Sequence, residues 1–389
     1  MTEATGTPFV LNADKDLEIS LRGFLRQLLE SGNIDALILP LKVPSGDSFA
    51  WILLNDAGMI DDAVPFPATM PVQGAKALRA LTRKENGELT VMALMRPCEI
   101  RAGIELSKLG QVNMDNLILA TYDCAGAVPL QNYVDDPVAA EKNFKEFFAT
   151  GEPGRNAKPV CASCTDFSMV DSDIHFGFFG VREKGMLVFA GTVRGTDLLS
   201  KMDLQPDSGN ELLPVWKAEV ERITEKRSSS REIVFKKTEK DIQGFSGMLN
   251  VFSNCIGCHN CQSACPVCYC RLCYFGSEAS RTYPEAMVNE AVKRGGVSLP
   301  PDRIMFHTGR LAHMSLSCVS CGQCTDACPV SIPVADVFSF VAEQTQQTFE
   351  YKAGKNDGKP LPLRDFKKSE LPGVHQIVKD AEPGGASHE

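Results

Sequence analysis

Eight of the fifteen cysteines fall into two copies of one spacing pattern. Each copy reads C-x2-C-x2-C-x3-C followed by proline, and the second copy begins sixty-three residues after the first. Ferredoxins use this run to hold [4Fe–4S] clusters, because its short gaps bring three thiolates from one tight loop to a small cage. The two copies are Cys255, Cys258, Cys261 and Cys265, and then Cys318, Cys321, Cys324 and Cys328.

In two-cluster ferredoxins the last cysteine of each run binds the other cluster. That rule predicts one ligand set of three cysteines from the first run with Cys328, and a second set of three from the second run with Cys265. The long segment between the runs leaves open a fold in which each run holds its own cluster. Paired C-x2-C units also bind structural zinc, which would make the protein a scaffold. Four cysteines and a Cys-Pro ending in both copies favour iron–sulfur clusters.

Four further cysteines lie in the N-terminal half. Cys98 and Cys124 each follow an apolar segment that predicts a buried strand, and the carboxyl ends of strands are where open α/β sheets bind ligands. Cys161 and Cys164 again have two residues between them. The residues alone leave two interpretations open, a third cluster or buried and inert thiols.

The remaining cysteines, Cys268, Cys270 and Cys273, follow Cys265 directly. Packing beside the cluster, where neighbouring groups tune its potential, is the favoured interpretation, and an irregular ligand set is the alternative. The three nearby histidines are expected to serve packing or surface roles, because both cysteine sets are already complete; they are His259, His307 and His313. The sequence lacks the GxSxG, Walker, HExxH and GxGxxG motifs, so no catalytic side chain is predicted.

The amino-acid composition indicates a soluble protein and argues against nucleic-acid binding and membrane-spanning classes. The 389 residues are 43% hydrophobic and 23% charged, which suits a soluble protein of two or three domains. A net charge of −9 argues against non-specific nucleic-acid binding, and no apolar run reaches the roughly 18 residues of a membrane span. The N-terminus has no signal-peptide pattern, so we expect a cytoplasmic protein whose cysteines bind metal, in an oxygen-poor cell.

Hydrophobic periodicity predicts alternating helices and strands up to residue 194, and mostly helices after residue 208. The expected fold class is an α/β N-terminal domain with a mainly parallel sheet, followed by a mostly helical, two-cluster ferredoxin-like domain. The expected segments are a flexible N-terminus at 1–15, the α/β domain at 16–227, a linker and helix at 228–252, the dicluster domain at 253–349, and a partly disordered extension at 350–389.

These stretches resemble the β-subunit family of formate dehydrogenases and coenzyme F-420-reducing hydrogenases. The likeness to the formate dehydrogenase β subunit is the closer, because that branch carries both ferredoxin runs and the CPVCYCRLC extension. It covers most of the chain, including RPCEIRAGIELSKLGQVNMDNLILATYDCAGA and the CASC loop with HFGFFG after it. The resemblance implies that Cys98, Cys124, Cys161 and Cys164 bind a third [4Fe–4S] cluster beside a flavin.

The resemblance also implies an electron-transferring subunit. Its expected partners are a formate dehydrogenase or hydrogenase catalytic subunit and another redox subunit, such as a heterodisulfide-reductase-type flavoprotein or a ferredoxin. The alternative is a flavin-dependent oxidoreductase that itself reduces coenzyme F-420 or a nicotinamide. The family has a Gly-Gly step entering its first helix, whereas this chain reads ADKDLEISLRGFLRQ. A side chain at that step would crowd a bound ring, so FAD binding is left open and no flavin-binding residue is assigned.

Overall fold

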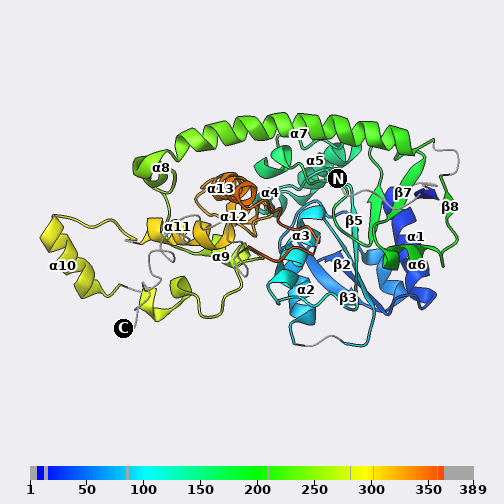
Figure 1. The fold of residues 1–389 in the computed structure, drawn as a ribbon, viewed down its shortest axis with the longest axis horizontal. Coiled ribbons are helices and arrows are strands. Elements are labelled where there is room, and N and C mark those ends of the chain that lie inside the picture. Colours follow the sequence, from blue (N-terminus) through cyan, green and yellow to red (C-terminus); the bar gives the residue numbers. More distant parts are fainter. Residues whose placement is uncertain are drawn as a thin grey trace, which may run out of the picture. The chain divides into compact units, whose positions relative to one another are not determined.

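A mixed β-sheet forms the centre of the N-terminal half (Figure 1). Its strands lie in the order β3-β2-β4-β5-β6-β7-β1-β8. The central strands β2, β4, β5 and β6 run parallel, and the outer strands pair antiparallel. The predicted α/β region is therefore confirmed, with antiparallel edges added. The strands are β1 Phe9–Asn12, β2 Ala36–Lys42, β3 Phe49–Leu54, β4 Val91–Met95, β5 Leu117–Tyr122, β6 Ile174–Gly177, β7 Gly185–Ala190 and β8 Gln205–Pro206.

The structure is a computed structural model that describes residues 7–12, 16–84, 87–207, 211–280, 282–300, 302–356 and 358–362. Met1–Asn356 form one unit and Asp357–Glu389 form another. The α/β region and the ferredoxin-like region both belong to the first unit. The domain boundaries inside that unit remain predictions.

Two layers of helices cover the sheet, because successive side chains of a strand point to opposite faces. Met92 and Leu94 of β4 join the large core formed with α1, α5 and the start of α7. Met95 points to the other face, against Gly74 at the start of α2. The helices of this half are α1 Leu17–Glu30, α2 Ala75–Thr82, α3 Pro97–Lys108, α4 Leu130–Asp135, α5 Pro137–Thr150 and α6 Val193–Leu199.

The C-terminal half is helical, as predicted, and packs around its own core of aromatic and aliphatic side chains, with Phe306 and Phe338 among them. Helix α10 projects away from that core, and none of its residues is buried (Figure 1). The helices are α8 Gly244–Val251, α9 Asn260–Ala264, α10 Pro284–Arg294, α11 Arg303–Met314, α12 Gln323–Asp326 and α13 Val334–Thr348.

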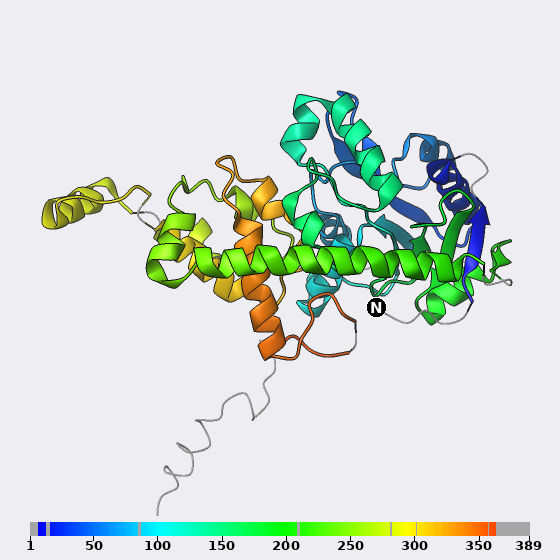
Figure 2. The ribbon, with the colours of Figure 1, turned by 90° about the horizontal axis from the view of Figure 1, so that it is seen from above.

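Helix α7, Leu213–Asp241, runs along both regions (Figure 2). The linker predicted at the start of the segment 228–252 is wrong, because residues 228–241 lie inside this helix. Serines are weak helix formers, but Glu, Lys and Arg on both sides are strong ones, and Arg231 stacks 4.5 Å over the Phe235 ring one turn further on. Within the described residues, no helix is both long enough and apolar enough to span a membrane.

Both ends of the described chain are more ordered than predicted. Phe9–Asn12 pairs with β7 and β8, so a flexible segment at 1–15 is wrong for these residues, and 1–6 and 13–15 lie outside the described residues. Near the other end, the Tyr351 hydroxyl and the Gly354 amide donate to buried Glu105 at 2.6 Å and 2.8 Å. The predicted extension therefore begins with a packed segment; residues 363–389 lie outside the described residues.

Gly177, at the end of β6, packs so closely against Trp216 that a larger side chain there should lower the stability of the protein. A Cβ atom there would lie 2.6 Å from Nε1 of Trp216, so we expect Gly177→Ala to lower the free energy of unfolding by about 1–3 kcal/mol through overpacking. Gly23, in the exposed face of α1, has nothing within 4 Å of its Cβ position. Gly23→Ala is the control and should raise stability by about 1 kcal/mol. Urea unfolding measures both, and equal effects would contradict the packing argument.

Candidate iron–sulfur centres

Four thiols of the N-terminal half line one cavity at the carboxyl edge of the parallel strands. Cys98 lies in the first turn of α3, directly after β4, and Cys124 follows β5. Cys161 lies in a short 3-10 turn, Pro159–Ser163, and Cys164 ends that turn. We call these four residues the N-terminal thiol site. The structure thus brings together the four cysteines that the sequence analysis grouped.

The start of α3 determines where Cys98 points. Pro97 occupies the first turn, and the Glu99 carboxylate accepts hydrogen bonds from the Arg96 and Gly74 amides, both at 2.9 Å. Glu99 is fully buried; burial raises its pKa, and Arg96 opposes that rise. A proline followed two residues later by glutamate is the local sequence signal for a helix that begins at this point.

Asp123 anchors the loop that carries Cys124, and the sequence analysis did not single it out. Its buried carboxylate accepts five hydrogen bonds, of 2.5–3.1 Å. Burial acts to raise its pKa, but the hydrogen bonds, led by that from His175, outweigh burial and lower it. The donors are Ser168 Oγ, Phe178 N, Trp216 Nε1, Phe179 N and His175 Nε2. Cys124 N itself donates to Phe167 O at 2.7 Å.

A second group of thiols lines another cavity. Cys265 from the first ferredoxin run lies there with Cys318, Cys321 and Cys324 from the second. We call these four the middle thiol site. Cys321 also lines the cavity of the N-terminal thiol site, together with Ser320. The two sites therefore share a wall.

The other ferredoxin cysteines gather around Cys261, and we call them the outer thiol site. Burial raises the pKa of the Cys261 thiol, Arg310 lowers it, and the three neighbouring thiols raise it further. Those neighbours are Cys255, Cys328 and Cys258. Cys258 is exposed, so this site reaches the surface.

Hydrogen-bond donors face the sulfur atoms of the outer site. Arg310 Nη1 donates to Cys261 Sγ at 3.1 Å, and the Ile332 amide donates to Cys328 Sγ at 3.4 Å. Donors of this kind stabilise negative charge on sulfur and tune a cluster's potential.

The histidines take packing and surface positions. His307 is buried, stacks on Phe252 with ring centroids 3.9 Å apart, and places Nε2 3.4 Å from Cys255 Sγ. Burial, helped by Arg310, lowers its pKa to about 3, so the ring is neutral at ordinary pH. His259 stacks on Phe306, and His313 is exposed.

The chemistry of the thiol cavities fits a metal centre, which replaces the proton of each thiol that it binds. Burial raises the pKa of Cys124 and Cys321 to about 12 and that of Cys318 to about 11. Such thiols stay protonated near neutral pH unless a metal displaces the proton. Four cysteine ligands are the donor set of a [4Fe–4S] cluster. Within the described residues, no three His, Cys, Asp or Glu side chains form a site for a single metal ion.

The three extra cysteines differ in their surroundings. Burial raises the pKa of Cys268 to about 11, and its neighbours include Cys265 and Arg310. Gln262 Nε2 donates to Cys273 Sγ at 3.4 Å, while Cys270 is exposed. None of the three lines the cavities of the N-terminal and middle sites.

Comparison with known proteins supports the iron–sulfur assignment. The family of 4Fe-4S dicluster domains matches residues 251–332. The F-420-dependent formate dehydrogenase 1 subunit beta of Methanococcus maripaludis is 28% identical over 88% of this chain and 92% of its own length. Over most of its length, this chain is similar to formate dehydrogenase β subunits. The corresponding subunit of Methanocaldococcus jannaschii is 23% identical over 70% of this chain and 76% of its own length.

A chain from the F-420-reducing [NiFe] hydrogenase complex of Methanosarcina barkeri gives a structural match with a TM-score of 0.46 and 16% identity. It covers 63% of this chain and 95% of that one. The sequence relatives confirm the resemblance stated above. They and the dicluster domain support an iron–sulfur electron-transfer subunit.

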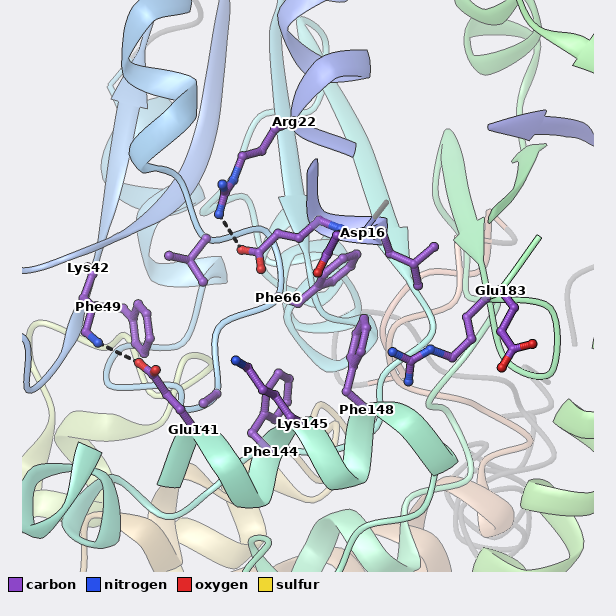
Figure 3. A pocket seen from close by; sticks show the side chains of 15 residues that line it. Asp16, Arg22, Lys42, Phe49, Phe66, Glu141, Phe144, Lys145, Phe148 and Glu183 are labelled. Carbon is purple, nitrogen blue, oxygen red and sulfur yellow. Dashed lines mark hydrogen bonds and ion pairs between the residues drawn. The ribbon is translucent and has the colours of Figure 1, made fainter. Parts of the chain in front are cut away.

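A larger cavity, of about 670 Å³, lies near the start of α1 (Figure 3). Its wall contains four phenylalanines, Phe49, Phe66, Phe144 and Phe148, and charged groups of both signs. Asp16 and Glu18, at the start of α1, also line it and place two carboxylates at that end of the helix. Phe66 contacts Tyr122 edge-on, and Tyr122 precedes Cys124 by two residues. The cavity thus adjoins the segment that holds the N-terminal thiol site.

Buried charges join the N-terminal site to the ferredoxin region. Lys158 Nζ lies 2.7 Å from Asp326 and 2.6 Å from Gln323 Oε1, and its side chain is 3% exposed. Val160 packs directly against Gly322, where a Cβ atom would lie 2.3 Å from the valine. These contacts hold the loop of Cys161 against the loop of Cys321.

A second buried pair lies beside the same boundary, and its arginine reaches across it. Arg101 lies 2.8 Å from Asp166, two residues after Cys164, and also donates to Val319 O at 3.3 Å. Arg101, together with Lys352, lowers the pKa of Asp166 to about 2 against the effect of burial. Neither pair was predicted, because each joins residues more than 60 positions apart.

Lys158 predicts a large loss of stability on substitution. Lys158→Met leaves the Asp326 carboxylate buried without its cation, which costs about 3–5 kcal/mol. Lys42→Met is the matched control, because Lys42 pairs with Glu141 at 2.6 Å where both side chains are 39% exposed. Pairs that exposed contribute about 0–1 kcal/mol. Chemical unfolding monitored by circular dichroism gives the free energy of unfolding of both variants. A loss below about 1 kcal/mol for Lys158→Met would contradict a structural role for the ion pair between Lys158 and Asp326.

Proposed function

We propose that the chain is the electron-transferring iron–sulfur subunit of a formate dehydrogenase or hydrogenase complex, relaying electrons between the catalytic subunit and another redox subunit. The observation that carries this proposal is the row of three four-thiol sites, of which the middle and N-terminal ones share Cys321 and Ser320 as a wall. The similarity to formate dehydrogenase β subunits over most of the chain supports it.

Each site has a proposed ligand set. Cys255, Cys258, Cys261 and Cys328 hold the outer cluster; Cys318, Cys321, Cys324 and Cys265 hold the middle one; Cys98, Cys124, Cys161 and Cys164 hold the N-terminal one. A [4Fe–4S] cluster supplies one-electron transfer when bound. The side chains around it supply thiolates, hydrogen bonds to sulfur and a water-poor cavity. No acid or base is needed for that step.

The two ends of the row offer different routes for electrons. At the outer site, Cys258 is exposed and the neighbouring Ile256 side chain is 57% exposed, so a partner protein can approach closely. At the N-terminal site, the segment Val64–Met70 lines both the thiol cavity and the 670 Å³ cavity. We infer that a catalytic subunit docks at one end and a heterodisulfide-reductase-type flavoprotein or a ferredoxin at the other.

A second candidate is a flavin-dependent oxidoreductase that reduces coenzyme F-420 or a nicotinamide directly. The aromatic lining of the 670 Å³ cavity and its closeness to Cys124 favour this candidate. Asp16 and Glu18 oppose it, because a helix N-terminus that would favour the phosphates of a dinucleotide carries two carboxylates here. Oxidation of NADPH by the isolated chain would support this candidate.

Metal and flavin analysis of one anaerobically purified sample separates the alternatives. We expect about twelve iron atoms per chain, three times four, and little zinc. Bound flavin at one per chain would favour the oxidoreductase, and its absence would favour the electron relay. About two zinc atoms per chain without sulfide, one for each ferredoxin run, would overturn both.

The crossed ligand assignment makes a specific prediction. Cys265→Ser should remove the same EPR signal as Cys321→Ser, although Cys265 belongs to the other run, and should lower iron by about four atoms, one cluster. Cys328→Ser should remove a different signal, and Cys270→Ser, in the same loop as Cys265 but exposed, serves as the control. If Cys265→Ser instead abolishes the signal lost in Cys258→Ser, each run holds its own cluster.

A further inference from the structure

Buried cations near the thiol sites fall into two groups. Lys158, Arg101 and Arg96 are paired with carboxylates at 2.7 Å, 2.8 Å and 3.7 Å. Arg227 and Arg310 are 3% and 2% exposed, and neither forms an ion pair within the residues that the structure describes. A buried charge without a counter-charge is strongly unfavourable. The second group therefore needs a source of negative charge.

Arg227 extends from α7 to the wall of the N-terminal thiol cavity. Its Nη2 donates to the carbonyl oxygens of Gly151 and Cys124, at 2.7 Å and 3.2 Å, and its guanidinium lies 4.1 Å over the Phe167 ring. Its Nε is buried without a hydrogen-bond partner. The thiols of Cys164, Cys124 and Cys161 are close enough to interact with its charge, and the Asp123 carboxylate, which forms no ion pair with it, acts on it less strongly.

Arg310 extends from α11 between the outer and middle sites. Its Nη1 donates to Cys261 Sγ and its Nη2 to Cys261 O, both at 3.1 Å. The same side chain lines the cavity of Cys265 and Cys324. Like Arg227, it has a buried Nε without a partner.

Both arginines thus place a buried positive charge beside cysteines, and hydrogen bonding to carbonyl oxygens does not explain why a charge is needed there. Amide or hydroxyl donors could satisfy the same carbonyl oxygens without burying a charge. Each charge instead lies against cysteine ligands of the proposed clusters. A cluster held by four thiolates carries net negative charge, which grows by one on reduction, so a nearby cation favours the reduced state.

We propose that Arg227 is the counter-charge of the N-terminal cluster and Arg310 that of the outer and middle clusters, and that each raises the reduction potential of the clusters it faces. This inference rests on the proposed function for the presence of the clusters. Arg227 and Arg310 are therefore positioning residues, which act on the clusters through their charge and take no part in electron transfer themselves. Lys158 and Arg101, whose charges are balanced by carboxylates, instead hold the two regions together.

The test is an EPR-monitored redox titration of the full chain. Arg227→Gln keeps donors for the two carbonyls and removes the charge, whereas Arg227→Lys keeps the charge. For Arg227→Gln we expect the reduction equilibrium of the N-terminal cluster to fall at least tenfold, about 59 mV for one electron. Arg227→Lys should stay near wild type. Lys236→Gln, on the same helix with a 79% exposed side chain, should change nothing.

Arg310→Gln provides the crossed control. It should lower the potentials of the outer and middle clusters and leave the N-terminal cluster unchanged, with the signals assigned by their loss in Cys258→Ser, Cys321→Ser and Cys161→Ser. Loss of the N-terminal cluster in Arg227→Gln but not in Arg227→Lys would equally support a charge role. Loss in both variants would mean that the arginine acts through its shape, which overturns the inference for Arg227.

The premise and the inference fail in different ways. Wild-type protein with only two cluster signals would overturn the third cluster of the proposed function, and with it the role of Arg227. Wild-type protein with all three signals, and with unshifted potentials in Arg227→Gln and Arg310→Gln, would overturn the inference alone.

Discussion

The buried ion pair between Lys158 and Asp326 is the interaction on which the arrangement of the thiol sites depends. Lys158 belongs to the α/β region and directly precedes the turn that carries Cys161, while Asp326 follows Cys324 in the ferredoxin region. Val160 against Gly322 excludes water beside the pair. Because both charges are almost fully buried, replacing either residue would leave the other charge buried without its partner, so the pair fixes how the two loops meet.

Burial strengthens the attraction between the charges of Lys158 and Asp326, but it disfavours the charged, thiolate form of the cysteines that lie nearby. A water-poor cavity favours neutral thiols, as the raised pKa values of Cys124, Cys318 and Cys321 show. Cluster assembly needs thiolates, so the free energy of deprotonation must come from iron binding and from nearby cations. The same burial that protects a bound cluster from solvent therefore makes the empty sites unfavourable for charge. Cluster insertion and the final packing of these loops should be strongly coupled.

Local sequence signals predicted most of this structure. The cysteine spacing grouped the thiols, and periodicity predicted the α/β region and the helical region that follows it. Residues 228–231 were mistaken for a linker because serines are weak helix formers, although the residues on both sides keep them helical. The other failures came from long-range contacts. Phe9–Asn12 has no distinctive strand pattern and is ordered by pairing with β7. Asp123 was missed for the same reason, since its donors lie 45 to 93 positions away.

Helix α7 connects the two regions without a flexible joint, and this affects how the chain tolerates changes in length. A helix turns by about 100° per residue, so one inserted residue would rotate everything beyond it by that angle. Arg227 and Arg231 face the N-terminal thiol loops, and Phe235 contacts Phe340 of α13 edge-on. A single insertion between Arg227 and Phe235 would bring one of these contacts out of register, whereas a coil linker would absorb it. The length of this segment is therefore as constrained as its residues.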